Sequence, residues 1–355
     1  MPGLLSTREG AFSFSRHALT STSMPRPEKL QILYEHPHWF RPLFAELDRR
    51  GLPWEPVQIA GHTFDPGEEA PLDGTLLFNR MSPSAWLRGL GSAIPYTTHL
   101  LDRLESTPSA PRIINGARAW ATEISKASQL GLLSRLGLPF PAARVIHDPA
   151  SAPRAAAGLR FPVVVKPNVG GSGAGVRRFE ASEALEAAAH AGELDLGLDG
   201  TGLVQEYIPA EEGRIVRVET LGGRFLYAIA IYSSGDDFNL CPADVCRSRG
   251  GAELQRSACA LDAPSNDLSV EAFTPPPAVI EAVERMTREA GIEIGGVEYL
   301  VDSRDGSLHY YDINALSNFV ADGPTVLGFD PFERLGDWLE QELKGSSANA
   351  RRRAS

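Results

Sequence analysis

The sequence contains little cysteine, no long apolar run and fewer basic than acidic residues. Three Cys in 355 residues are too few for a disulfide-stabilised scaffold and are typical of a reducing compartment, so we expect a cytoplasmic protein. No apolar run approaches the roughly 20 residues that a membrane-spanning helix needs, so no membrane partner is expected. The 34 Lys and Arg against 45 Asp and Glu, a formal charge of −11, exclude a general nucleic-acid binder, because neutralisation of phosphates supplies most of that affinity.

The length predicts two or three domains, because a single core rarely serves so long a chain. Apolar residues make up 43% and charged residues 22%, which is typical of a globular protein. Residues 1–27 are rich in Ser, Thr and Arg without a sustained period, and we expect a disordered leader. They resemble a transit peptide weakly, and translation from Met24 is the favoured alternative. The small, basic tail over 344–355 is also expected to be disordered.

Residues 28–112 alternate strand and helix patterns and predict a small N-terminal α/β domain. Apolar runs at 30–34, 57–60 and 76–78 are the expected strands, and 39–50 is a helix ended by Gly51. In such sheets the loops after strands form ligand crevices; here those loops are 36–38 and 79–83. His36 and His38 in the first loop suit either a metal or an ordinary loop, which is favoured because no third ligand lies within sequence reach.

Two further units are expected over 113–205 and 206–343. Their predicted elements are a helix capped by Ser125 and stopped by Gly137, a strand at 161–166, a helix capped by Ser182, a hairpin of 216–221 and 224–231 around Gly222-Gly223, a helix from Pro277, strands at 295–301 and 308–314, and a last helix from Pro331. A long polar segment at 233–275 separates the first hairpin from the helix at Pro277.

The most informative stretch is the glycine-rich run from Phe161 to Val176. Glycines let backbone N–H groups turn toward a phosphate. A Walker loop would end in Gly-Lys-Ser/Thr, which is missing, and a dinucleotide fingerprint needs a helix directly after the glycines, where 176–179 is a predicted strand. The pattern is therefore strand, loop, strand. A plain hairpin is the alternative, but it leaves unexplained why Lys166 stands in an apolar strand, where an unpaired ammonium is costly.

A second constellation lies on the last predicted hairpin. Asp312 and Asn314 are two residues apart on a strand and face the same way, and a three-residue loop at 304–306 would place Glu298 opposite Asp312. Like charges in such positions repel, and a hard divalent cation would remove the conflict, because carboxylate and amide oxygens suit Mg²⁺. The alternative is that one carboxylate faces solvent beside a Lys or Arg.

The glycine loop with its lysine and the Glu-Asp-Asn cluster together resemble the ATP-grasp superfamily. The RimK-type branch, glutathione synthetase and D-alanine–D-alanine ligase are the most similar members, and the resemblance covers roughly 113–325. It implies an α/β plus α+β chain, in which the small N-terminal α/β domain precedes a two-subdomain ATP-grasp fold (113–205 and 206–343) with ATP between two antiparallel sheets. It also implies ATP and Mg²⁺ as cofactors, with two ions expected and Mn²⁺ as an alternative metal.

The resemblance assigns roles residue by residue. It places Lys126 and Lys166 on the ATP phosphates, Gly171, Ser172, Gly173 and Gly175 in the loop that covers them, Glu206, Tyr207 and Ile208 at the adenine, Glu212 at the ribose, Glu298, Asp312 and Asn314 on the metal, and Ser317 and Asn318 at the substrate. It aims Arg217 into the cleft as a catalytic residue, and Arg247 and Arg249 are the candidates for the contact with the γ-phosphate and the substrate carboxylate, for which one of the two suffices. Three assignments have alternatives. Lys126 could be a solvated lysine at a helix start, Arg217 could form a surface pair with Glu219, and the acid of relatives falls nearer Ile215 than Glu212.

The reaction implied by the resemblance is ATP-dependent joining of a carboxylate to an amine through an acyl phosphate, releasing ADP and phosphate. The expected partners are small-molecule carboxylate and amine substrates, amino acids or peptides, and a homodimer is the assembly considered. A phosphotransferase on the same fold and a nucleotide-binding module without chemistry are the competing functions. The N-terminal domain and the 233–275 segment are expected to decide the substrates.

Overall fold

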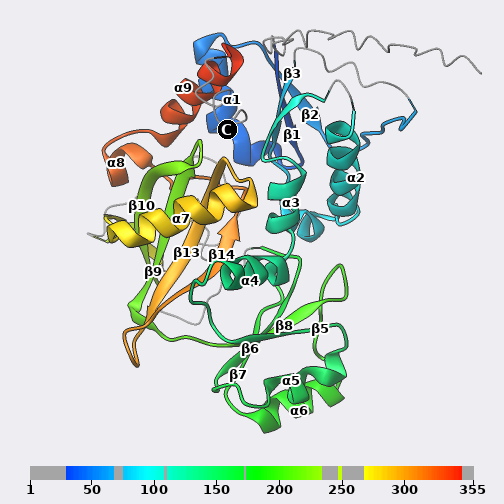
Figure 1. Cartoon of the computed structure of the whole chain (residues 1–355), viewed down its shortest axis with the longest axis vertical. Coiled ribbons are helices and arrows are strands. Elements are labelled where there is room, and N and C mark those ends of the chain that lie inside the picture. Colours follow the sequence, from blue (N-terminus) through cyan, green and yellow to red (C-terminus); the bar gives the residue numbers. More distant parts are fainter. Residues whose placement is uncertain are drawn as a thin grey trace, which may run out of the picture.

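The computed structural model describes residues 29–67, 75–107, 110–171, 173–233, 247–249 and 268–345. The predicted leader, the tail from 346, Ser172, the three cysteines and most of the 233–275 segment lie outside the described residues. The chain forms three sheets with helices around them (Figure 1). Within the described ranges no helix is both long and apolar enough to cross a membrane.

The N-terminal sheet is wholly parallel and has the order β2-β1-β3-β4. Its strands are β1 (Lys29–Tyr34), β2 (Trp54–Gln58), β3 (Thr75–Asn79) and β4 (Arg112–Ile114), and its helices are α1 (Arg41–Arg50) and α2 (Ala93–Glu105). Gly51 ends α1 in the left-handed conformation, as predicted. β2 starts three residues before the expected strand, because it pairs with β1 from Leu30 onward. β4 joins this sheet, so the sheet continues past the predicted boundary at 112.

The small sheet is antiparallel, with the order β5-β8-β6-β7. It consists of β5 (Ala143–Ile146), β6 (Val163–Pro167), β7 (Arg177–Phe179) and β8 (Gly202–Glu206), and α5 (Ala152–Ala156) and α6 (Ser182–His190) cover one face (Figure 1). The prediction that Ser182 caps α6 is wrong. Ala181 takes the extended N-cap position, so Ser182 is already the first helical residue. Two helices, α3 (Ala117–Glu123) and α4 (Lys126–Arg135), precede this sheet, and Ser125 caps α4 as expected by accepting a hydrogen bond from the Ser128 N–H.

The large sheet has the order β11-β12-β10-β9-β13-β14 and is antiparallel except between β11 and β12. Its strands are β9 (Ala210–Leu221), β10 (Arg224–Ser233), β11 (Arg247–Ser248), β12 (Leu268–Phe273), β13 (Ile294–Asp302) and β14 (Leu308–Asn314). The helix α7 (Pro277–Ala290) crosses one face (Figure 1), where Val216, Val218 and Val297 pack against it. Side chains alternate along a strand, so Arg217, Glu219 and Glu298 lie on the opposite face.

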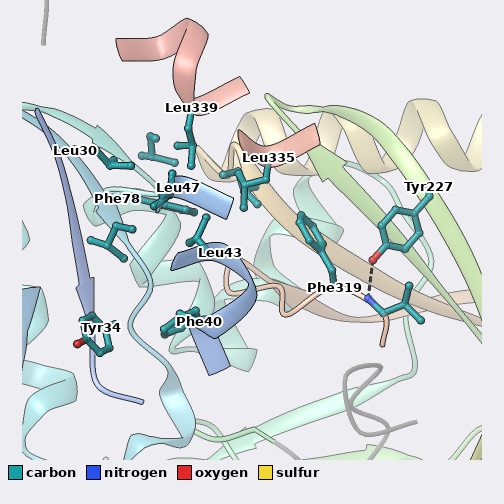
Figure 2. Packing of buried hydrophobic residues seen from close by; sticks show 14 of the residues in the cluster. Leu30, Tyr34, Phe40, Leu43, Leu47, Phe78, Tyr227, Phe319, Leu335 and Leu339 are labelled. Carbon is teal, nitrogen blue, oxygen red and sulfur yellow. Dashed lines mark hydrogen bonds between the residues drawn. The ribbon is translucent and has the colours of Figure 1, made fainter. Parts of the chain in front are cut away.

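A continuous apolar core joins the N-terminal domain to the large sheet. Figure 2 shows Phe40, Leu43 and Phe78 of the N-terminal domain beside Leu335 and Leu339 of α9 (Pro331–Leu343). Arg50 of α1 strengthens this contact, since its Nη1 lies 2.8 Å from Asp337 Oδ1. A short helix, α8 (Gly323–Leu327), precedes α9. The last helix therefore packs on the N-terminal domain although it follows the large sheet in sequence.

Candidate active site

A cavity of ≈ 400 Å³ is lined by residues of the small sheet, the large sheet and the N-terminal domain. Most of the predicted site residues line it, namely Lys126, Lys166, Gly171, Gly173, Glu206, Tyr207, Ile208, Arg217, Glu298, Asp312 and Asn314. Among the candidates whose side chains the structure describes, Gly175, Glu212, Arg249 and Ser317 are not lining residues, whereas Asn318 is. Segments far apart in sequence thus meet around one hollow.

Two lysines face this cavity from the small sheet and the start of α4. Lys166 on β6 is buried, with 9% of its surface exposed. Burial and the neighbouring Lys126 cation lower the pKa of Lys166 to about 7. Asn168 fixes the relative position of the two elements, because its Oδ1 accepts hydrogen bonds from the Ala127 N–H at 2.9 Å and from Ser125 Oγ at 3.2 Å. A single side chain after β6 therefore ties the start of α4 to the glycine loop.

The glycines of the loop divide into those that line the cavity and one that packs against β6. Gly171 and Gly173 line the cavity. Gly175 instead has a φ of +75°, and a Cβ there would lie 2.8 Å from Pro167 Cγ. Gly175 therefore has a steric role against β6, and its contact with a phosphate stays a prediction. Ser172 lies outside the described residues.

The segment that leads from the small to the large sheet carries the predicted adenine contacts. Ile208 is buried and lines the cavity. The Tyr207 N–H donates to the Pro162 carbonyl at 2.9 Å, and Glu206 Oε1 accepts from the Arg160 N–H at 2.8 Å. Two of the predicted adenine groups are thus engaged in holding the segment. Glu212 has a φ of +56° and is exposed, and the structure does not bring it to the cavity.

The predicted pairing of Glu298 with Asp312 is confirmed by the register of β13 and β14. The route differs from the expectation. Tyr299 pairs with Tyr310, so Tyr311 is an extra residue in β14 that shifts the register by one. The Tyr311 hydroxyl also donates to Glu298 Oε2 at 2.7 Å. A bulge, not a three-residue loop, sets the two carboxylates opposite each other.

A half-buried lysine and a buried arginine offset these carboxylates. Lys126 Nζ lies 2.7 Å from Asp312 Oδ1, and Arg217 Nη1 lies 2.9 Å from Glu298 Oε1 while its Nε bonds Glu219 at 2.6 Å. Burial opposes the charge on Asp312, but Lys126 outweighs it and lowers the pKa of Asp312. Burial raises the pKa of Glu298 despite Arg217. The pair of Arg217 with Glu219 exists but is buried, so its interpretation as a surface pair is wrong.

The donor set suits a magnesium ion. Glu298 and Asp312 supply carboxylate oxygens, and Asn314 donates through Nδ2 to Asp312 Oδ2 at 3.3 Å, which leaves its Oδ1 as a ligand atom. Within the described ranges, no group of three or more His, Cys, Asp and Glu side chains gathers as a metal site. A site here would therefore consist of two carboxylates and an amide. In the part of the chain that the structure describes, His36 and His38 gather no third His, Cys, Asp or Glu ligand.

The two arginines of the long segment lie at the edge of the large sheet. β11 pairs with β12, and the Arg249 guanidinium stacks 3.7 Å from the centroid of the Tyr232 ring. Arg249 thus has an aromatic partner outside the cavity lining. The backbone of Arg247 belongs to β11, and its side chain lies outside what the structure describes.

Several cavity residues were not predicted from the sequence. Trp39, Ser82 and Ser84 come from the N-terminal domain. Of these three, Ser82 had a sequence signal, because it lies in the 79–83 loop, which follows a predicted strand. Glu123 is a buried carboxylate whose pKa is raised by burial to about 7. It accepts hydrogen bonds from the Ala315 and Leu316 N–H groups. No sequence pattern marks Glu123, because its partners are almost 200 positions away.

The comparisons with known proteins agree with this architecture. Residues 124–243 match the family model of the RimK-like ATP-grasp domain. A protein of Pectobacterium carotovorum named probable alpha-L-glutamate ligase is 27% identical over 288 residues, which cover 77% of this chain and 85% of that protein.

Two solved structures share the fold. The ATP-grasp ligase PsnB, complexed with a phosphomimetic variant of its minimal precursor, Mg and ADP, has a TM-score of 0.59 at 20% identity and aligns over 88% of this chain and 98% of its own. A RimK domain ATP-grasp protein from Sphaerobacter thermophilus has a TM-score of 0.59 at 19% identity, over 87% and 99%. With the sheets, the cavity and the family match taken together, the chain has an ATP-grasp fold and carries a RimK-like ATP-grasp domain at residues 124–243.

Proposed function

We propose that the chain is an ATP-dependent carboxylate–amine ligase that forms an amide bond and releases ADP and phosphate. One observation carries the proposal. Two lysines suited to phosphates, Lys166 of the small sheet and Lys126 at the start of α4, share a cavity with the facing carboxylates Glu298 and Asp312 of the large sheet. A plain nucleotide-binding module has no need of two carboxylates facing each other in the cavity.

The arrangement assigns tasks to the protein's own residues. Lys166 and Lys126 bind the phosphates, and Lys126 exchanges its Asp312 partner for a phosphate oxygen when the nucleotide enters. Glu298, Asp312 and Asn314 would hold Mg²⁺, as two ions with Mn²⁺ as an alternative; the metal would offset phosphate charge during transfer. Arg217, buried between Glu219 and Glu298, faces the reacting end of the cavity and neutralises charge there.

The chemistry proceeds in two displacements. A carboxylate oxygen of the substrate attacks the γ-phosphorus, the bond from that phosphorus to the β–γ bridging oxygen breaks, and ADP leaves. An amine then attacks the acyl carbon, loses a proton, and phosphate leaves with the bonding electron pair. Neither step needs a protein nucleophile, so the protein acts by positioning and charge neutralisation.

The substrate class is drawn from the relatives. The name of the Pectobacterium protein contains glutamate, and PsnB was solved with a peptide precursor. We therefore propose L-glutamate as the first amine to test, and free amino acids and peptides as carboxylate donors. The low cysteine content favours the cytoplasm as the compartment.

The test is ADP release on mixing ATP, Mg²⁺, L-glutamate and a panel of amino acids and peptides, with products identified by mass spectrometry. A ligase yields a condensed product, and hydroxylamine traps its acyl phosphate as a hydroxamate. A phosphotransferase yields a phosphorylated substrate without amine incorporation. Failure of every pair to release ADP above the rate with ATP alone would leave only a binding module.

A matched pair of variants strengthens the test. Glu298→Gln should abolish turnover, whereas Glu284→Gln, which alters a glutamate of α7 paired with Arg224 at 3.0 Å, should leave it unchanged. Equal loss in both variants would point to general destabilisation instead of a metal site.

A further inference from the structure

The segment that follows β14, residues 315–320, forms one wall of the cavity. Leu316 and Asn318 line the cavity, while Ser317, Phe319 and Val320 are buried behind it. The segment is neither helix nor strand, so no backbone ladder holds it. Side chains from elsewhere must fix its conformation.

Buried polar side chains from the large sheet and the α3 region supply part of this support. Glu123 accepts the N–H groups of Ala315 and Leu316, and Asn115 Nδ2 donates to the Ala315 carbonyl at 2.7 Å. At the other end the Val320 N–H donates to the Tyr227 hydroxyl at 3.0 Å (Figure 2). Both ends of the segment are thus held by hydrogen bonds, and other side chains must hold its middle.

The middle is held by Arg80 of the N-terminal domain, and Arg217 Nη2 also lies 3.5 Å from Ser317 Oγ. One guanidinium nitrogen of Arg80, Nη2, donates to the Ser317 carbonyl and lies 3.4 Å from Asn318 Oδ1. Arg80 is 2% exposed, and its guanidinium lies 4.9 Å from the Phe40 centroid and 5.1 Å from that of Phe78. Arg80 Nε and Nη1 are buried and have no hydrogen-bond partner within the described part of the chain.

This burial is costly for a cation. Desolvation lowers the pKa of Arg80 to about 9, against the opposing charges of Glu219 and Glu123. An apolar side chain of similar length would fill the aromatic pocket without that cost. What an arginine adds at this place is its donors, which act on Ser317 and Asn318.

The donors of Arg80 determine how Asn318 is oriented. Arginine has no acceptor, so Asn318 must present its amide oxygen to Arg80. Asn318 lines the cavity, and an amide oxygen turned to Arg80 leaves the two N–H groups of its amide for a ligand there. A donor at this position recognises a hydrogen-bond acceptor and disfavours an ammonium group.

We propose that Arg80 is a positioning residue that turns the Asn318 amide so that its N–H groups bind a carboxylate or carbonyl oxygen of the substrate. The proposal rests on the ligase function, in that the ligand is a substrate of that reaction. What it adds to the substrate position that the resemblance implies for Asn318 is the group that orients this side chain, Arg80 of the N-terminal domain.

The decisive variant is Asn318→Asp. Its carboxylate would pair with Arg80 and keep the segment in place, but it carries no N–H for the substrate. We expect an unchanged or higher melting temperature, an Mg-ADP affinity within about twofold of wild type, and a KM for the carbonyl-bearing substrate raised about 10- to 100-fold, the range for loss of a hydrogen bond to a charged group. A purely structural contact predicts wild-type KM, and that result would overturn the proposal.

A second measurement separates Arg80 from the chemistry. Hydrogen exchange of the 316–320 amides in the ligand-free protein should quicken at least about tenfold in Arg80→Met, and Arg80→Lys, which keeps a charged donor, should restore part of the protection. Wild-type exchange in Arg80→Met would refute positioning by Arg80 whether or not the protein turns over. If no substrate pair turns over in the wild type, the ligase function fails and the substrate half of the proposal fails with it, while the exchange result still decides the positioning half.

Discussion

Asp312→Asn is the change that best separates metal binding from folding. From the sequence, removing one of two facing carboxylates should leave folding unharmed or improve it. The structure reverses that sign, because Asp312 Oδ1 lies 2.7 Å from Lys126 Nζ, and both side chains are about a fifth exposed or less, at 22% and 17%. The asparagine oxygen can still accept from Lys126, but as a neutral group.

The magnitude follows from these contacts. A hydrogen bond to a charged group contributes about 1.5–3 kcal/mol and a neutral one about 0.5–1.5 kcal/mol, so the exchange costs roughly 1–2 kcal/mol. Relief of the repulsion with Glu298, which Arg217 already reduces, returns about 0.2–1 kcal/mol. The net loss is about 1 kcal/mol, or about 2 °C in melting temperature for a chain of this length. Turnover should fall by at least on the order of 100-fold, since a group that stabilises the transferring charge is lost.

The assay is paired: melting temperature without ligand, and ADP release at saturating ATP and Mg²⁺. Asp337→Asn is the matched control, because Asp337 also accepts from a cation, Arg50 at 2.8 Å, but is half exposed and lies outside the cavity. It should keep full turnover. An Asp312→Asn protein that stays active, that melts at a higher temperature, or that loses activity only by unfolding would refute the assignment.

Three further outcomes are expected. ATP affinity should weaken as the pH rises through about 7, where Lys166 loses its proton, and calorimetry should show no such step in Lys166→Arg. Gly175→Ala should destabilise the protein by about 1–3 kcal/mol with little change in ATP affinity, because φ is +75° and a Cβ would meet Pro167; Gly137→Ala, with φ +65° and no neighbour within 4 Å, should cost less in the same denaturant titration. Hydrogen bonds from Arg304 and Arg160 lower the pKa of Asp302 to about 2 from 3.8. The stability that ionised Asp302 gives the folded protein should be complete above pH 3.8 and be lost as the pH falls toward 2. An acid unfolding titration of Asp302→Asn should lack this pH-dependent loss.

The hairpin of β13 and β14 shows how much of the candidate site could be predicted from the sequence. The spacing of Asp312 and Asn314 and the apolar character of Val297 and Ile313 predict that the carboxylate and amide side chains share one face, and the structure agrees. The pairing with Glu298 was predicted for the wrong reason. A bulge is an unpaired residue, and nothing in the local pattern distinguishes a strand with a bulge from one with a longer turn.

What the sequence determined by itself was local: the cap at Ser125, the hairpin at Gly222-Gly223, and a lysine within the apolar strand β6. These features follow from the periodicity of apolar residues and from the backbone preferences of single residues, and both depend only on residues close together in the sequence. Only the tertiary structure decided which charges meet. Lys126 and Asp312 are 186 positions apart, and Arg80 and Ser317 are 237 apart. Such pairs form because the order of strands and the packing of the N-terminal domain on the large sheet bring them together, and hydrophobic burial, which drives that packing, carries no local signal of which polar groups it will enclose.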